Sequence, residues 1–231
     1  LNSIEQMTRH FEALPGAAFG VQLDSGMNRL GLEPEEWDAV TEIALDQGPA
    51  LLMSHLASAD EADSPQNAEQ LRQFREMTQG IGVPRSLAAT GGILLGPEYH
   101  FELTRPGIGL YGGLPFADAA PAVRLSLPVI QTRLVRAGES VGYNATWTAD
   151  RDRLVATIGA GYADGLPRAL SNTGQLFWEG VPCPIVGRVS MDLITVDVSH
   201  LSEEPPALDI LGPGQGIDEL AAAAGTIGYE M

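Results

Sequence analysis

The chain has 231 residues, a hydrophobic content of 44% and a formal net charge of −17. This length fits one large domain or two ordinary ones, and the hydrophobic content is enough for a packed core. The negative charge argues against nucleic acids and anionic membranes as partners. No apolar run approaches the length of a membrane span and no signal peptide opens the chain, so a cytoplasmic location is expected. The single cysteine, Cys183, excludes an internal disulfide framework.

The first 110 residues alternate between helical and strand-like patterns. Helices are expected over residues 4–13, 34–47 and 67–79, and strands over residues 19–23, 50–53, 86–89 and 99–103. This alternation predicts right-handed βαβ units in a parallel sheet. Four strands are half of the eight in a (β/α)8 barrel, and a complete doubly wound domain is the alternative.

The pattern changes after about Pro121. Residues 123–136, 154–158, 174–178, 184–189 and 193–198 are strand-like, and only residues 217–224 have a helical pattern. An all-β domain following an α/β domain is therefore expected. We place the two domains at residues 1–121 and 122–231.

One stretch, residues 159–168, combines three glycines with a tyrosine directly after a predicted buried strand. Gly159, Gly161 and Gly165 allow a sharp turn around Tyr162, whose hydroxyl is titratable. A dinucleotide site is disfavoured because the glycine spacing differs from the fingerprint and Pro167 would stop the helix that follows. A tight turn with a packed tyrosine and a functional site both remain open.

Polar residues follow each of the four predicted strands of the first domain. They are residues 24–29, Ser54 and His55, Thr90 and Gly91, and residues 105–107. In a barrel these strand ends line the site, and the last two commonly hold a phosphate. Each residue also has a structural alternative: a core histidine, a helix cap or a surface arginine. The four His and one Cys have no metal-ligand spacing, so no catalytic metal is expected.

Four motifs, at residues 24–31, 105–112, 161–165 and 187–192, resemble those of the alanine racemase family in the same order. The resemblance extends over essentially the whole chain. It implies the C-terminal half of a (β/α)8 TIM-like barrel, which binds pyridoxal phosphate (PLP), followed by a β-barrel-like C-terminal domain. The implied activity is racemisation of L-alanine to D-alanine, which supplies D-alanine for cell-wall peptidoglycan.

The resemblance also assigns roles to residues. The reaction uses two bases on opposite faces of a substrate–PLP aldimine, of which Tyr162 is one and a lysine that carries PLP is the other. Arg29 would contact the tyrosine hydroxyl or the substrate carboxylate, and His55 would neighbour the tyrosine or the cofactor. A neighbouring cation favours a phenolate, which a tyrosine acting as a base near neutrality requires.

For the cofactor, the family pattern places Arg105 at the pyridine nitrogen. Thr90, in place of the usual Ser, would hold the phosphate together with the amides of Gly107 and Ile108. Met191 would contact substrate from the partner subunit, because the family site is completed across a head-to-tail homodimer.

The chain also departs from the family pattern. All 13 basic residues are Arg, so no side-chain amine is available for a Schiff base. By resemblance, the PLP lysine would precede Leu1 and a phosphate-binding tyrosine would follow Met231. Gln22 stands where many members carry a carbamylated lysine.

We therefore expect the protein that contains this chain to be active and the 231-residue chain alone to be inactive. A racemase with another or a broader amino acid range, and a PLP-binding or interaction module without catalysis, remain alternatives.

Overall fold

A computed structural model describes every residue of the chain, 1–231, and the chain divides into two units, Leu1–Gly109 and Leu110–Met231. Each unit has its own buried apolar cluster. None of the helices combines the length and the apolar character that crossing a membrane requires.

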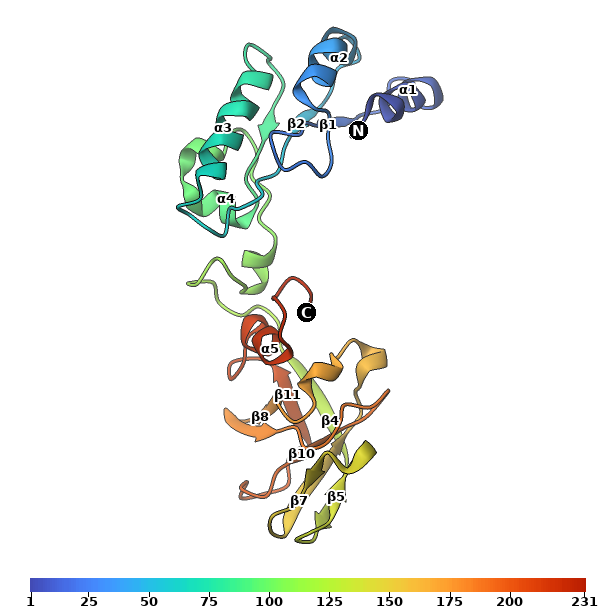
Figure 1. Cartoon of the computed structure of the whole chain (residues 1–231), viewed down its shortest axis with the longest axis vertical. Helices are drawn as coiled ribbons and strands as arrows, with labels where there is room; N and C mark the ends of the chain where they lie inside the picture. The colour runs from blue at the N-terminus through green and yellow to red at the C-terminus, as the bar shows by residue number, and fades with distance from the viewer. The chain divides into compact units, whose positions relative to one another are not determined.

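The first unit contains a parallel sheet in the order β1-β2-β3, with helices between the strands (Figure 1). Its elements are α1 (Ile4–Ala13), β1 (Gly20–Gln22), α2 (Pro34–Asp46), β2 (Leu51–Met53), α3 (Pro65–Met77), β3 (Arg85–Ser86) and α4 (Thr90–Leu95). The three predicted helices and the parallel pairing are confirmed. Local signals set the helix starts: the Ser3 hydroxyl accepts from the Gln6 amide, and Pro34 and Pro65 open their helices at a position where no amide donor is needed.

The predicted fourth strand over residues 99–103 is wrong. Tyr99 ends a short 3₁₀ turn, and Phe101 adopts a φ of 53° that no strand accommodates. Phe101 packs edge-on against Phe74 of α3, which holds this segment away from the sheet. The chain rejoins the sheet later, where the Arg105 amide donates to the Ala88 carbonyl at 2.9 Å. The predicted polar end of this strand, at Arg105, therefore still lies at the sheet edge.

The core of the first unit lies between the sheet and its helices. Trp37 of α2, Phe74 of α3 and Leu52 of β2 are each at most 1% exposed. Burying side chains of this size contributes roughly 1.5–3 kcal/mol each. The Trp37 indole nitrogen donates to the Met77 carbonyl at 2.9 Å, so its one polar group is also satisfied. This core fixes the sheet whose strand ends carry the candidate site.

The second unit is built on six antiparallel strands in the order β10-β7-β4-β11-β8-β9 (Figure 1). A bridge between Ile185 and Val196 joins the two edge strands, so the sheet closes into a barrel. The strands are β4 (Leu125–Val135), β7 (Arg153–Ile158), β8 (Gln175–Trp178), β9 (Val181–Pro184), β10 (Ile194–Asp197) and β11 (Ala207–Leu211). A small hairpin, β5 (Ser140–Val141) with β6 (Trp147–Thr148), and helix α5 (Ile217–Ala224) complete the unit.

Four predicted strands and the helix of this unit are confirmed, and the predicted strand over residues 184–189 is wrong. The strand in this region is β9, which ends at Pro184. Residues 185–189 do not continue it, because Gly187 turns the chain at a φ of 83°. A β-carbon at Gly187 would lie 2.8 Å from the Val141 carbonyl oxygen, so only glycine fits there. Strands β5, β6 and β11 were not predicted.

Candidate functional site

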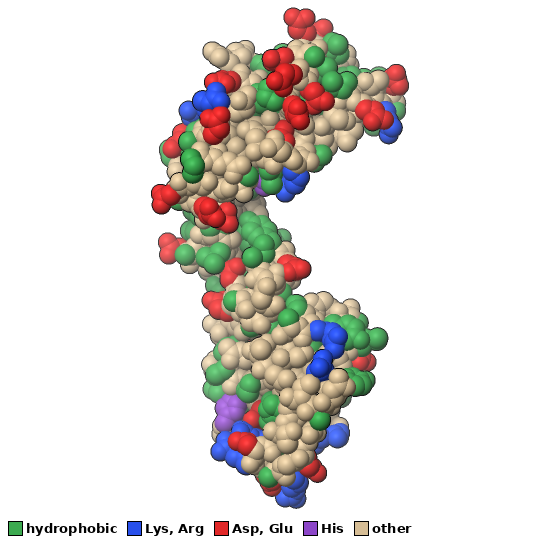
Figure 2. Space-filling view, viewed as in Figure 1, with side chains coloured by type: hydrophobic (Ala, Val, Ile, Leu, Met, Phe, Trp, Pro, Cys, Tyr) green, Lys and Arg blue, Asp and Glu red, His purple; other side chains and the backbone are tan.

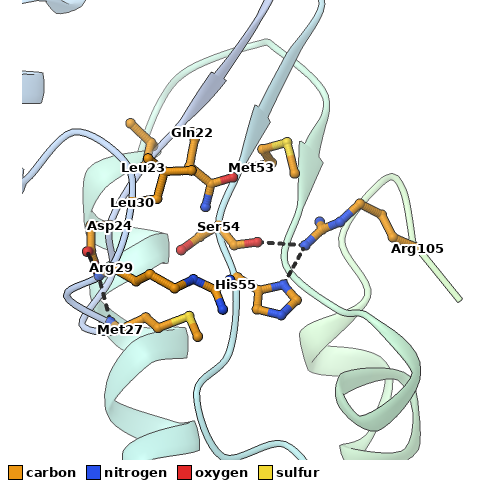
Figure 3. Close-up of a pocket in the computed structure, with 10 residues that line it drawn as sticks. All are labelled: Gln22, Leu23, Asp24, Met27, Arg29, Leu30, Met53, Ser54, His55 and Arg105. Atoms are coloured by element: carbon orange, nitrogen blue, oxygen red, sulfur yellow. Dashed lines mark hydrogen bonds between the residues drawn. The ribbon is translucent and has the colours of Figure 1, made fainter. Parts of the chain in front are cut away.

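In the first unit, one cavity of about 210 Å³ opens at the ends of β1 and β2. It is lined by Gln22, Leu23, Asp24, Met27, Arg29, Leu30, Met53, Ser54, His55 and Arg105. Figure 3 shows Arg29 and Arg105 approaching His55 from opposite sides. The structure thus brings together three of the sequence-predicted site residues from three separate segments.

Arg105 is held by neutral acceptors in and directly after the neighbouring strands. Its guanidinium donates to the Ser86 hydroxyl at 2.5 Å and to the Ser54 carbonyl at 2.7 Å, and it approaches the Leu87 carbonyl at 3.4 Å. Ser54 and Ser86 are themselves buried. Because these acceptors are neutral, the positive charge of Arg105 is fixed in direction and is not cancelled locally. Burial lowers the pKa of Arg105 below its ordinary value, and a guanidinium still keeps its proton.

His55 lies half-buried beside Arg105, with its Nδ1 atom 3.3 Å from the guanidinium. A guanidinium only donates hydrogen bonds, so Nδ1 accepts and the ring proton belongs on Nε2. Burial, then the charge of Arg105, then the charge of Arg29 lower the pKa of His55 below its ordinary 6.5. His55 is therefore a neutral ring between two cations at neutral pH.

Arg29 stands on an exposed loop between two anchored ends. The Asp24 amide donates to the Leu32 carbonyl at 2.8 Å, and the Leu32 amide donates to the Gln22 carbonyl at 2.9 Å. No acidic side chain pairs with Arg29. The space-filling view shows acidic side chains gathered over the helices of this unit (Figure 2). An unpaired arginine in a chain of net charge −17 marks the cavity as a place for an anion.

A second group of predicted residues lies on the segment that follows the third strand. Thr90 begins α4 rather than capping it, and its buried hydroxyl accepts from the Gly107 amide at 3.0 Å and the Gly109 amide at 3.3 Å. Both acceptor positions of the oxygen are used, so the hydroxyl proton is left to donate. A β-carbon at Gly107 would meet nothing within 4 Å, so open space lies next to these groups. A hydroxyl donor beside open space suits a phosphate.

In the second unit, the structure joins two of the sequence motifs. The Tyr162 amide donates to the Ser190 carbonyl at 3.0 Å, and the Ala163 amide donates to the Met191 carbonyl at 2.8 Å. A β-carbon at Gly161 would lie 2.3 Å from the Ser190 oxygen, which explains the glycine before the tyrosine. Tyr162 is 42% exposed and Met191 is 57% exposed. The predicted turn therefore presents both side chains to solvent from one rigid segment.

A second tyrosine of this unit, Tyr143, was not predicted as a site residue and is 71% exposed. It opens a short turn in which Asn144 and Ala145 adopt φ values of 62° and 47°. Left-handed backbone at a non-glycine residue is a strained conformation, and such strain concentrates at functional sites. The signal in the sequence was a Gly-Tyr pair, Gly142 with Tyr143, which is one of three such pairs in the chain.

Tyr143 also lines a large cavity of the second unit, of about 920 Å³, together with Arg188 and Ser190 of the fourth motif. The turn is packed closely against that motif, since a β-carbon at Gly142 would lie 3.4 Å from the Arg188 amide nitrogen. The Arg188 Nε atom is buried without a hydrogen-bond partner. Tyr143 is thus a polar, outward-facing group on a fixed support, beside an incompletely satisfied arginine.

These features define a class: an α/β unit with a cationic, anion-directed cavity at its strand ends, followed by a β-barrel unit that presents tyrosines. Family models described as "Alanine racemase, N-terminal domain" and "Alanine racemase, C-terminal domain" match residues 1–115 and 122–231. Curated alanine racemases of Cereibacter sphaeroides (strain ATCC 17029) and Ruegeria sp. (strain TM1040) are 70% and 63% identical over the whole chain, which covers 66% and 67% of their lengths.

Solved structures give the same result. The biosynthetic alanine racemase of Pseudomonas aeruginosa is 36% identical with a TM-score of 0.87, and the match covers 100% of this chain and 68% of that one. The alanine racemase of Bartonella henselae, solved with covalently bound pyridoxal phosphate, is 33% identical with a TM-score of 0.86, over 98% and 66%. The chain belongs to the alanine racemase family. It spans about two thirds of the length of its curated relatives.

Proposed function

We propose that the protein containing this chain interconverts L- and D-alanine with PLP as cofactor. The observation that carries the proposal is the cavity in which Arg29 and Arg105, neither paired with an acid, flank a neutral His55. The names of the relatives give the substrate. The cofactor follows from the bound group of the Bartonella henselae structure.

The residues fit this cofactor. Its phosphate is an anion, and the Thr90 hydroxyl has a proton to donate beside the open space at Gly107. We assign the Gly107 and Ile108 amides to it as further donors, and the Gly107 amide, which donates to Thr90, would then share its hydrogen with the phosphate. When bound, PLP withdraws electrons from the α-carbon of an attached amino acid, which makes its α-proton acidic.

Arg105 controls how far that withdrawal goes. If the pyridine nitrogen of bound PLP lies at Arg105, the guanidinium would donate a hydrogen bond to it and keep its own proton, because an arginine side chain is not deprotonated in proteins. His55 accepts from Arg105 and so helps to keep the guanidinium in one orientation. A limited withdrawal of this kind would favour return of the α-proton over side reactions.

Arg29 recognises the substrate carboxylate. Its guanidinium has no protein anion to satisfy it, and a bidentate arginine–carboxylate contact is both strong and directional. Holding the carboxylate fixes which faces of the α-carbon are presented to the two bases, one of which would be a lysine supplied outside this chain.

The other base is a phenol of the second unit. Sequence reasoning proposes Tyr162, and we now favour Tyr143, because its strained turn and its place on the large cavity present the hydroxyl to an incoming group. Tyr162 remains the alternative. In a head-to-tail homodimer, the second unit of one copy would complete the cavity of the first unit of the other, with Met191 as a further contact to substrate.

The test is racemisation by the protein expressed from the full coding sequence. Incubation with L-alanine should yield D-alanine, measured by chiral chromatography, and the purified protein should absorb in the visible range where PLP bound to a lysine does. Sedimentation should give twice the chain mass. The isolated 231-residue chain should show no turnover. PLP binding without turnover of alanine, or faster turnover of another amino acid, would favour the corresponding alternative. A protein of this kind would provide D-alanine for the cell wall in the cytoplasm.

A further inference from the structure

The loop that carries Arg29 is organised around one buried carboxylate. Oδ1 of Asp24 accepts from the amides of Gly26, Met27 and Asn28 at 2.8, 2.9 and 3.1 Å, and Oδ2 accepts from the Arg29 amide at 3.2 Å. Four successive amides therefore converge on a side chain that is only 8% exposed. Charged hydrogen bonds of this kind are about twice as strong as neutral ones.

These contacts use the carboxylate completely. Although Asp24 lies five residues from Arg29 and lines the same cavity, the two side chains form no ion pair. The Asp24 carboxylate accepts hydrogen bonds from backbone amides only, so the positive charge of Arg29 is not neutralised by it. The same carboxylate fixes the Arg29 backbone, which determines where the side chain starts.

The loop is also anchored beneath Asp24. The Ser25 and Ser54 hydroxyls are buried and hydrogen-bonded at 2.7 Å, and the Ser54 carbonyl accepts from Arg105. Gly31, at a φ of 124°, closes the loop where a β-carbon would lie 2.8 Å from the Asp24 amide nitrogen. The loop of Arg29 and the side chain of Arg105 are thus both anchored at Ser54, the loop through the Ser54 hydroxyl and Arg105 through the Ser54 carbonyl.

We infer that Asp24 is a positioning residue, which holds Arg29 in the direction that places its guanidinium in the cavity beside His55. The inference rests on the proposed function only for its effect on catalysis. Its effect on Arg29 itself can be measured without any turnover.

The experiment is a double-mutant cycle with Asp24→Asn and Arg29→Gln in the holoenzyme made from the full coding sequence. Asparagine keeps the acceptor for three amides and turns an NH2 group toward the Arg29 N–H. We expect Asp24→Asn to lower kcat/KM for alanine by about 10- to 100-fold through misplacement of Arg29. In the Arg29→Gln background, Asp24→Asn should change kcat/KM by no more than about a further twofold, since Asp24 acts through the arginine that has already been removed.

The second readout is the pKa of His55, from NMR titration of its ring protons. Arg29 is one of the charges that lower this pKa, after burial and Arg105. Arg29→Gln should raise the pKa of His55, and Asp24→Asn should raise it too. The double variant should have the same His55 pKa as Arg29→Gln alone. Glu219→Gln is the matched control, because the Glu219 carboxylate also accepts from a backbone amide, that of Gly216 at 2.9 Å, in the second unit.

Additive losses in kcat/KM, with a His55 pKa unchanged by Asp24→Asn, would overturn the inference and leave Asp24 as a loop-stabilising residue. If the unsubstituted protein does not racemise alanine, the proposed function fails and the pKa cycle still decides the role of Asp24. If Asp24→Asn does not fold, Asp24→Ser, whose hydroxyl retains one or two of the amide bonds, takes its place in both measurements.

Discussion

Removing one hydroxyl group from either exposed tyrosine of the second unit separates the two candidates for its catalytic base. Tyr143→Phe and Tyr162→Phe each keep the ring, and neither hydroxyl makes a hydrogen bond within the protein, so the free energy of unfolding should not change beyond about 0.5 kcal/mol. Loss of a positioned general base lowers the rate by roughly 10²–10⁴-fold, which is about 3–5 kcal/mol of activation free energy. We expect this loss for Tyr143→Phe.

The loss should affect one enantiomer. In the two-base scheme, a tyrosine serves the face of L-alanine and the lysine serves the face of D-alanine. Incubating each variant separately with L- and D-alanine in D₂O and following α-deuterium by NMR measures each face directly. Tyr143→Phe should retain exchange from D-alanine and lose it from L-alanine, while Tyr162→Phe should exchange both.

Two results would refute this reasoning. If Tyr162→Phe shows the one-sided loss and Tyr143→Phe does not, the base is Tyr162, as the sequence motif predicted. Backbone strain and the large cavity would then not identify the base. If either variant loses exchange equally from both enantiomers while remaining folded, that tyrosine supports the site without acting as a base.

Three further predictions concern the first unit. Arg105→Lys should produce a new long-wavelength absorption band when alanine is added, because an ammonium can give up its proton to the ring nitrogen; an unchanged spectrum would contradict the role of Arg105. Gln70→Leu should reduce the free energy of unfolding in urea by about 2–4 kcal/mol, since Gln70 is 1% exposed and bonds both the Ala57 amide and the His55 carbonyl, whereas the exposed Gln66→Leu should cost less than about 1 kcal/mol. The folded-state pKa of His55 is lowered, so the unfolded chain binds this proton first and stability should fall as the pH drops below about 6.5; His55→Gln should make the urea midpoint less sensitive to pH between about 7.5 and 5, and an equal sensitivity would refute this.

Much of the fold could be predicted from local sequence signals. Helix α5 has the predicted bounds, and α1 and α2 end within one residue of theirs, because caps, prolines and apolar periodicity act over a few residues. The segment around Phe101 was mispredicted as a strand because its conformation depends on distant partners. Phe101 packs on Phe74 and lies under the guanidinium of Arg85, which in turn pairs with Glu102.

In the site, too, some features follow from local sequence signals and others depend on distant partners. A rule about strand ends selected His55, and it selected Arg105 through a strand that does not form, yet the structure places both residues in one cavity. The groups that orient Arg105 were not predictable, since Ser54 contributes a backbone carbonyl and Ser86 is an ordinary buried hydroxyl in the sequence pattern. The turn of Tyr143 was missed for a similar reason: its two flanking strands are only two residues long and form by packing against Gly187.

Charge explains why these orienting groups are neutral. The chain carries 30 acidic residues against 13 arginines, so an acidic partner for either cavity arginine would be easy to provide. An ion pair would hold the guanidinium as firmly as the observed contacts do, but it would cancel the charge that an anionic ligand needs. Arg105 is instead held by hydroxyl and carbonyl oxygens, and Asp24, an acid of the cavity lining, is saturated by backbone amides. The cavity therefore keeps both positive charges for a ligand within a strongly acidic protein, which is the requirement for binding a phosphate-bearing cofactor and a carboxylate substrate together.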